Sequence, residues 1–249
     1  NTSPAIALGT IKAKSIEKDP ILLILAADHF IQDIDQFIEI INKGVDYAEK
    51  GNIVNFGIKP NSPETGYGYI EAQNPLELDK GKGSPIKKFI EKPSLKKAQK
   101  LILSNKYLWN SGIFLTKANV VFDEMSKHSP FLISQCEKAL NESYFDLDFL
   151  RVKEDVFCKC PDISFDIAIM EKTKLGYVLP LNVGWNDIGN WNSIWEISEK
   201  DNLGNAISGN IVLENSKKSY LTSENRLVVA LGIENLIVVD TQDAILIAD

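Results

Sequence analysis

The chain has 249 residues, of which 44% are apolar and 24% charged, and 34 acidic residues outnumber 27 basic ones. A chain of this length can bury a large core without disulfides or structural metals. The net charge of −7 argues against nucleic acid or an anionic membrane as the main partner, because both attract an excess of cations. The longest apolar run, residues 21–27, is too short to span a bilayer, and no secretory leader is visible.

The cysteine count favours a reducing compartment, and we therefore expect a cytoplasmic protein. Cys136, Cys158 and Cys160 are an odd number without the spacing of a disulfide framework. A zinc site is not expected, because Cys158 and Cys160 are too closely spaced and the chain has only two histidines, His29 and His128.

The pattern of apolar residues predicts strands and helices that alternate along the first four-fifths of the chain. Helices are expected at residues 4–16, 31–50, 94–103, 119–140 (divided at Ser129-Pro130), 163–172 and 188–197. Strands are expected at residues 21–27, 53–58, 67–71, 86–91, 112–115 and 177–181. This alternation predicts an α/β fold with a layered sheet that is parallel at its centre.

Two regions carry more specific expectations. Residues 21–27 are continuously apolar, which predicts a strand buried on both faces. Residues 67–71 and 86–91 are separated by a polar stretch containing Pro and Gly, which is typical of a hairpin.

The character of the sequence changes near Asn202. Short strands are expected at residues 207–213, 226–231, 236–240 and 244–248, with no helix between them. We therefore predict two domains, residues 1–202 and residues 203–249. The second is all-β, with coils of a solenoid and a minor sheet as the two alternatives.

Two acidic residues stand where predicted strands end. Asp28 follows residues 21–27, and Asp187 lies between a strand and a helix. Ligands of open α/β sheets bind at the carboxyl ends of the strands, and carboxylates there can hold Mg²⁺. The alternative is that each residue caps a turn or a helix N-terminus.

A second candidate group surrounds Glu91-Lys92-Pro93, which ends another strand. The carboxylate of Glu91 can accept hydrogen bonds from sugar hydroxyls, and the ammonium of Lys92 suits a phosphate. The alternative is an exposed ion pair of little energetic value.

Two further motifs could contact a ligand. Gly66-Tyr67-Gly68 precedes a strand, and glycine lets the backbone approach a ligand closely; a tight turn is the alternative. Asn110, in Trp109-Asn110-Ser111-Gly112, offers both a donor and an acceptor; a turn asparagine is the alternative.

Taken in order, these motifs resemble one family, the bacterial mannose-1-phosphate guanylyltransferases. The resemblance extends over the whole chain, and the segments that carry it are Asn1-Thr2-Ser3-Pro4-Ala5, Ala26-Ala27-Asp28-His29, Gly57-Ile58-Lys59-Pro60, Pro63-Glu64-Thr65-Gly66-Tyr67-Gly68-Tyr69-Ile70, Phe89-Ile90-Glu91-Lys92-Pro93, Trp109-Asn110-Ser111-Gly112, Ile169-Met170-Glu171-Lys172 and Gly184-Trp185-Asn186-Asp187-Ile188-Gly189. The resemblance implies a Rossmann-like nucleotidyltransferase domain followed by a short left-handed β-helix.

The resemblance also implies a reaction, in which GTP and mannose-1-phosphate give GDP-mannose and pyrophosphate, and a homodimer. It implies Mg²⁺ held by Asp28 and Asp187, which with Lys92 form the catalytic group. It further implies that Gly68, Glu91, Lys92 and Asn110 bind the sugar phosphate, and that Asn1, Thr2 and Ser3 lie near the guanine.

One family feature is absent from these 249 residues, the glycine-rich triphosphate signature G-G-x-G-T-R. The resemblance implies that this segment lies upstream of Asn1. Two other functions stay open: a sugar-1-phosphate nucleotidylyltransferase for glucose-1-phosphate or dTTP, and a non-catalytic sugar-nucleotide-binding module.

Overall fold

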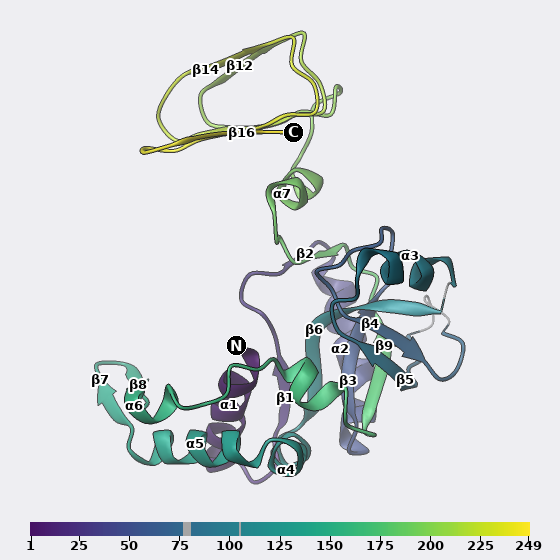
Figure 1. Ribbon diagram of the computed structural model, residues 1–249, viewed down its shortest axis with the longest axis vertical. Helices are drawn as coiled ribbons and strands as arrows, with labels where there is room; N and C mark the ends of the chain where they lie inside the picture. Colours follow the sequence, from purple (N-terminus) through teal and green to yellow (C-terminus); the bar gives the residue numbers. More distant parts are fainter. Residues whose placement is uncertain (77–80, 105) are drawn as a thin grey trace. The chain divides into compact units, whose positions relative to one another are not determined.

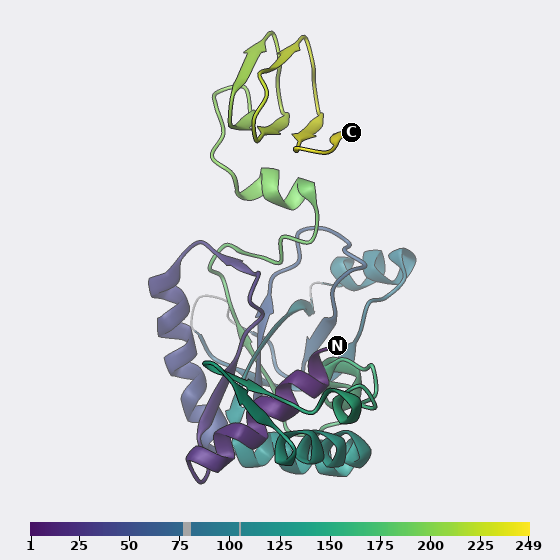
Figure 2. The same cartoon turned by 90° about the vertical axis from the view of Figure 1, so that its left-hand side faces the viewer.

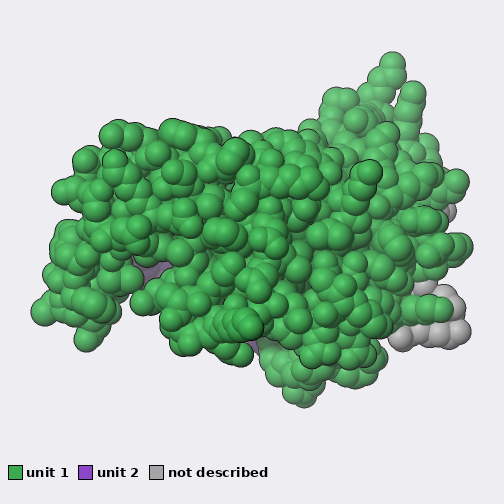
Figure 3. Space-filling view, turned by 90° about the horizontal axis from the view of Figure 1, so that it is seen from below, with its two compact units in different colours: residues 1–27, 31–185 green, residues 28–30, 186–249 purple. Residues whose placement is uncertain are grey.

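The computed structural model describes residues 1–76, 81–104 and 106–249. The chain forms two compact units, one of residues 1–27 and 31–185, which fills most of the view in Figure 3, and one of residues 28–30 and 186–249. The boundary expected near Asn202 between sequence domains stays a prediction. Residues 186–202 belong to the second compact unit because Ile194 and Trp195 pack against its strands.

The first unit is an α/β fold, as the alternation of elements predicted. Its sheet has six strands, β1 (Ile21–Ile24), β6 (Tyr107–Lys117), β3 (Ile53–Ile58), β9 (Gly176–Pro180), β5 (Ser84–Ile90) and β4 (Tyr69–Ala72), in this spatial order. The predicted hairpin is confirmed, since β4 and β5 pair antiparallel. Two short ribbons accompany the sheet, β2 (Phe30–Ile31) with β10 (Trp185–Asn186) and β7 (Tyr144–Asp146) with β8 (Phe149–Arg151).

The two central strands of the sheet, β3 and β9, run parallel, as expected, whereas the sheet as a whole is mixed. Of the strand pairs within it, β3 and β9 run parallel, whereas β1, β3 and β4 each pair antiparallel with β6. The antiparallel pairs lie on either side of this centre, and β4 and β5 form one of them because no crossover helix separates them.

Helices cover both faces of the sheet (Figures 1 and 2). The helices are α1 (Thr2–Ile16), α2 (Ile34–Glu49), α3 (Leu95–Leu103), α4 (Ala118–His128), α5 (Pro130–Asn141) and α6 (Glu154–Phe157). Alternate residues of β3 face different layers, because successive side chains of a strand point to opposite sides. Ile53 packs with α1, α4 and α5, whereas Val54 and Phe56 pack with α2. The predicted division of residues 119–140 at Pro130 is confirmed.

The expectation for residues 21–27 is wrong in one respect. The strand is shorter, Ile21–Ile24, and its residues alternate between exposed and half-buried, with Leu23 39% exposed. Among the described strands β1 lies at the edge of the sheet and pairs with β6, and the side chains of Ile21 and Leu23 on one of its faces are exposed. The apolar run therefore predicted the strand correctly but not its burial.

The second unit contains helix α7 (Trp191–Ile197) and six short strands, which are β11 (Ala206–Ser208), β12 (Ile211–Glu214), β13 (Tyr220–Ser223), β14 (Val228–Leu231), β15 (Ile237–Asp240) and β16 (Ile245–Ala248). β11, β13 and β15 form one parallel ladder, and β12 and β14 form another. Partners such as Tyr220 and Ile237 recur one coil apart, so this unit is β-helix-like rather than a minor sheet. The expected strand at residues 207–213 is two strands, because Gly209 turns the chain at φ 95°.

None of the helices in the described residues is long and apolar enough to cross a membrane.

A pair of glycine substitutions tests the packing of the central strand. A Cβ at Gly57 would lie 2.6 Å from Leu108 Cδ1 and 2.8 Å from Val178 Cγ2, so Gly57→Ala should lower the free energy of unfolding by about 1–3 kcal/mol. Gly9 is exposed in α1 and a Cβ there would meet no atom within 4 Å, so Gly9→Ala should stabilise by about 0.5–1 kcal/mol. Denaturant unfolding measures both; equal effects would contradict the packing described.

Candidate functional site

Three backbone irregularities in the first unit belong to residues that meet at one site. The pairing of β3 with β6 shifts register between Asn55 and Gly57, opposite Gly112, which has φ 71°. Lys92 has φ 40°, in the left-handed region that an L-residue rarely adopts. The residues predicted as a helix at 163–172 form instead a π-helical turn, η1 (Asp166–Met170). Bulges, π-turns and strained residues are over-represented at functional sites.

The side chain of Asn110 is fixed in one orientation. Its Oδ1 accepts hydrogen bonds from Asn55 Nδ2 at 2.6 Å and from the backbone N–H of Gly112 at 2.9 Å. Its Nδ2 donates to Asp166 Oδ1 at 2.7 Å. Because one amide proton of Nδ2 is used in this way, the second can still be donated to a ligand.

Gly68 and Glu91 lie directly beside Asn110. The backbone N–H of Asn110 donates to Gly68 O at 2.8 Å. A Cβ at Gly68 would lie 2.7 Å from Glu91 Oε2 and 3.2 Å from Asn110 Cβ, so only glycine leaves room for these side chains. The structure therefore brings together three residues that the sequence predicted for one subsite, and their role in binding stays a prediction.

Glu91 carries an unused acceptor. Its side chain is 12% exposed, and its Oε2 is buried without a hydrogen-bond partner among the described residues. Burial first, and then the nearby carboxylate of Asp166, raise the pKa of Glu91 to about 7 against the opposing effect of Lys92. Lys92 Nζ lies 3.7 Å from Glu91 Oε1 and is 65% exposed, so it remains open to an anion.

Aromatic residues order the loop that leads to Gly68. The ring of Tyr67 packs edge-on against Trp109 and Trp185, at centroid distances of 5.0 and 5.5 Å. The hydroxyl of Tyr69 donates to Glu64 O at 2.8 Å. These contacts hold the loop against the sheet. Such a fixed backbone at Gly68 favours the predicted contact with a ligand over the alternative of a tight turn.

Asp28 and Asp187 belong to the second unit, and both act on the same imidazole. Burial lowers the pKa of His29, while the charges of Asp28 and Asp187 raise it, so both carboxylates lie near this ring. Asp187 Oδ1 also accepts a hydrogen bond from Gly189 N at 3.2 Å. The described residues contain no cluster of three or more metal-ligating side chains. Two carboxylates fit Mg²⁺, which commonly takes one or two from the protein and completes its shell with phosphate and water.

Asn1, Thr2 and Ser3 begin helix α1. Asn1 Oδ1 caps the helix by accepting from Thr2 N, and Thr2 Oγ1 accepts from Phe165 N at 2.9 Å. Asn1 and Thr2 are exposed, whereas Ser3 is fully buried. Their role near a guanine stays a prediction, and the burial of Ser3 makes a direct side-chain contact there difficult.

Sequence reasoning assigned no role to Asn55, Asp166 or Glu171. A polar residue in the apolar strand 53–58 was a signal for Asn55, because a buried amide needs partners. Asp166 and Glu171 lie in and next to the segment of η1, and Glu171 Oε1 accepts from Glu91 N at 3.4 Å. No local pattern shows that η1 meets β6, since Asn110 and Asp166 are 56 residues apart in the sequence.

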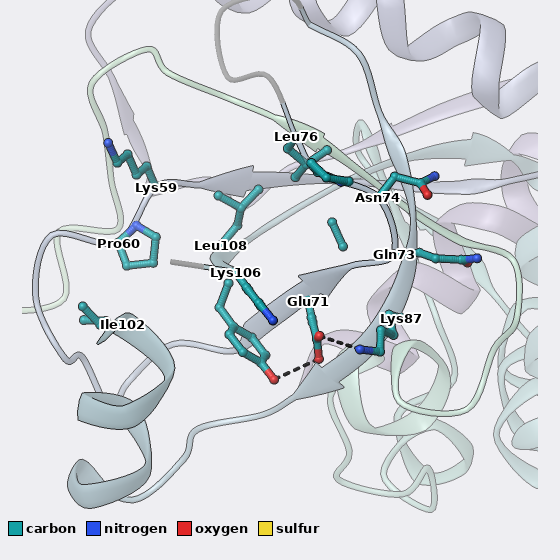
Figure 4. Close-up of a pocket in the computed structure, with 13 residues that line it drawn as sticks. Lys59, Pro60, Glu71, Gln73, Asn74, Leu76, Lys87, Ile102, Lys106 and Leu108 are labelled. Atoms are coloured by element: carbon teal, nitrogen blue, oxygen red, sulfur yellow. Dashed lines mark hydrogen bonds and ion pairs between the residues drawn. The ribbon is translucent and has the colours of Figure 1, made fainter. Parts of the chain in front are cut away.

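A separate pocket of about 620 Å³ lies at the other end of β4, β5 and β6 (Figure 4). Its polar lining includes Lys59, Glu71, Lys87 and Lys106. Glu71 is bound by Lys87 at 2.8 Å and by the hydroxyl of Tyr107 at 3.0 Å, as the dashed lines in Figure 4 show. None of the residues predicted for a site lines this pocket.

Comparison with known proteins identifies the family of the chain. A family model described as Nucleotidyl transferase matches residues 1–203, and one described as MannoseP isomerase/GMP-like beta-helix domain matches residues 209–249. The chain therefore belongs to the nucleotidyl transferase family, with a β-helix-like C-terminal part.

The names of similar proteins are more specific than the description of the family. The chain is 46% identical over 252 residues to a mannose-1-phosphate guanylyltransferase of Salmonella montevideo, and 44% identical over 255 residues to one of Escherichia coli K12. Each comparison covers 100% of this chain and 53% of the relative, so the chain spans about half the length of the curated relatives it matches.

Two solved structures are also similar. A Thermus thermophilus protein described as mannose-1-phosphate geranyltransferase matches 100% of this chain and 70% of its own, with a TM-score of 0.85 and 29% identity. A Helicobacter pylori protein described as mannose-6-phosphate isomerase matches 75% of this chain and 70% of its own, with a TM-score of 0.66 and 35% identity.

The raised pKa of Glu91 predicts a pH-dependent gain in stability for Glu91→Gln. A carboxyl whose pKa is raised from 4.5 to about 7 by folding is tolerated while it is protonated, and it destabilises the fold increasingly as the pH rises through this range. The glutamine variant should therefore exceed the wild type by up to about 3 kcal/mol at pH 8. The advantage should shrink towards pH 5.

Denaturant unfolding at both pH values measures this difference. Glu137→Gln, at an exposed position of α5, is the matched control and should change stability little at either pH. A Glu91→Gln variant with the same advantage at pH 5 and pH 8 would contradict the burial of an ionisable Glu91.

Proposed function

We propose that the full-length protein catalyses the reaction of GTP with mannose-1-phosphate to give GDP-mannose and pyrophosphate. A phosphate oxygen of the sugar phosphate attacks the α-phosphorus of GTP, a new P–O bond forms, and the bond to the leaving pyrophosphate breaks. The names of the relatives support this choice of substrates, since they describe mannose-1-phosphate guanylyltransferases. A homodimer and a cytoplasmic location, both expected from the sequence, stay predictions.

The observation that carries the proposal is the unpartnered, buried Oε2 of Glu91 beside Gly68 and Asn110. A buried polar atom without a partner is costly, so its retention favours a ligand that supplies one. A sugar hydroxyl supplies a donor, and the second proton of Asn110 Nδ2 supplies a donor to the same sugar. Lys92 is exposed at the edge of this group and offers its charge to the phosphate.

Nucleotidyl transfer depends on positioning two anionic substrates and neutralising their charge. Lys92 supplies one positive charge for the sugar phosphate. Asp28 and Asp187 are the residues that would hold Mg²⁺, which when bound supplies charge neutralisation for the phosphates. Glu91 and Asn110 hold the sugar, so that the phosphate oxygen is presented in one orientation.

Pyrophosphate release by the full-length protein tests the substrates. Mannose-1-phosphate is offered with each of the four NTPs and with dTTP, and GTP should be strongly preferred. Release with another nucleotide, or with glucose-1-phosphate, would keep the reaction class and correct the substrate. No release with any pair would favour a non-catalytic binding module. An isomerase reaction, as named for the Helicobacter pylori structure, releases no pyrophosphate and would be detected by its sugar product alone.

The metal assignment has its own test. Asp187→Asn should abolish magnesium-dependent turnover in the full-length protein while circular dichroism and the unfolding midpoint stay unchanged, because an amide is a poor replacement for a carboxylate on Mg²⁺. Asp123→Asn, at an exposed position of α4, is the matched control and should retain turnover. Retained turnover of Asp187→Asn with an unchanged magnesium titration would refute the metal role.

A further inference from the structure

Asp166 holds the nitrogen end of the Asn110 amide. Its Oδ1 accepts the hydrogen bond of Asn110 Nδ2 at 2.7 Å, and this bond is the only one that fixes the nitrogen end of the amide within the described residues. The oxygen end is fixed by Asn55 and Gly112. Removing Asp166 therefore leaves a nearly buried amide nitrogen without its partner.

The π-helical turn explains how two carboxylates reach the same place. The N–H of Glu171 donates to Asp166 O at 2.9 Å, which is the i to i+5 bond of a π-turn and widens the helix by one residue. Ala168, Ile169 and Met170 of the turn are buried in the core, so the turn is held rigidly. Glu171, at its end, accepts from the backbone N–H of Glu91.

We infer that Asp166 is a positioning residue of the sugar subsite: it holds the amide of Asn110 and forms, with Glu91 and Glu171, a wall of hydrogen-bond acceptors that selects a polyol. The inference rests on the proposed function for the identity of its ligand. It goes beyond the proposed function because it assigns a role to Asp166, a residue to which the sequence motifs gave none.

The chemistry of the wall defines the class of ligand. The carboxylate oxygens of Glu91, Asp166 and Glu171 are hydrogen-bond acceptors, and Lys92 is the cation that faces Glu91 and Asp166. A ligand must therefore bring donors, and neighbouring hydroxyls of a sugar ring are donors at a suitable spacing. A sugar that lacks one of these hydroxyls would leave a buried carboxylate oxygen without a partner and should bind less well.

Two variants separate the two roles of Asp166. Asp166→Ala removes both the hydrogen bond and the charge. Asp166→Asn removes the charge, but its Oδ1 can still accept from Asn110 Nδ2. Asp148→Ala, at an exposed position in the turn between β7 and β8, is the matched control.

In the full-length protein, Asp166→Ala should raise KM for mannose-1-phosphate about 10- to 100-fold, while KM for GTP and kcat stay near the wild-type values. A merely structural role would impair all of these parameters together or change the unfolding midpoint alone. Asp166→Asn should give a KM at pH 8 between those of Asp166→Ala and the wild type, because it keeps the bond to Asn110 but loses one acceptor oxygen, and Asp148→Ala should match wild type throughout.

The pH profile supplies a second readout. The charged groups that face Glu91 are Asp166, Lys92 and Glu171, and the charge of Asp166 raises the Glu91 pKa after the larger effect of burial. In Asp166→Asn the pH at which the affinity for mannose-1-phosphate falls should therefore move to lower values. An unchanged profile, together with an unchanged KM in Asp166→Ala, overturns the inference.

The failure of this inference and that of the proposed function can be told apart. If the wild type releases no pyrophosphate but binds mannose-1-phosphate in a calorimeter, the proposed function fails, and the same variants are compared by dissociation constant, with the same expected ratios. If the wild type turns over and Asp166→Ala leaves KM for the sugar phosphate unchanged, the inference alone fails. A wild type that binds no sugar phosphate overturns both.

Discussion

The hydrogen bonds of one nearly buried amide, that of Asn110, hold the candidate site together. Because an amide in the core must satisfy both its oxygen and its nitrogen, each partner is drawn from a different element: Asn55 from β3, Gly112 from β6 and Asp166 from η1. The pairing of β3 with β6 shifts register between Asn55 and Gly57, directly opposite Asn110. The irregular backbone thus coincides with the position of this amide.

The same constraint concentrates negative charge. Asp166 must lie next to Asn110, and Glu91 lies beside Gly68, so two carboxyl groups share a site that offers Lys92 as the facing cation. Burial raises the pKa of both carboxyl groups, Glu91 to about 7, and the charges of neighbouring carboxylates add to the effect of burial. Such a site destabilises the folded chain, and a ligand with several hydroxyls offsets this by satisfying the acceptors. The carboxyl group of Glu91 thus lowers the stability of the folded chain, while the same group is the proposed acceptor for a sugar hydroxyl.

Much of the fold could be predicted from the sequence. Contacts between residues that are far apart in the chain could not, because local patterns do not contain them. The strand at residues 53–58 and the helices flanking Pro130 follow from local periodicity, which depends only on near neighbours. The burial of β1 was mispredicted because an apolar run indicates a strand but does not say whether another layer covers it. The predicted strand 112–115 is part of the longer β6, since Asn110 and Gly112 interrupt the apolar pattern at the bulge.

Gly68, Glu91 and Asn110, predicted for one subsite from motifs next to strands, lie side by side in the structure, and their role in binding remains a prediction. Asp166 was not predicted, because its partner is 56 residues distant in sequence and only the fold brings the two together. The roles expected for Asp28, Asp187, Lys92 and Asn1–Ser3 depend on ligands and remain predictions.

A crystal structure of the full-length protein with mannose-1-phosphate is the most direct measurement of the central claim. The account predicts a sugar hydroxyl within hydrogen-bond distance of Glu91 Oε2, with the amide of Asn110 unchanged and donating to the sugar. A sugar bound elsewhere, for example in the pocket between Lys59 and Lys106, with Glu91 Oε2 still without a donor, would contradict it.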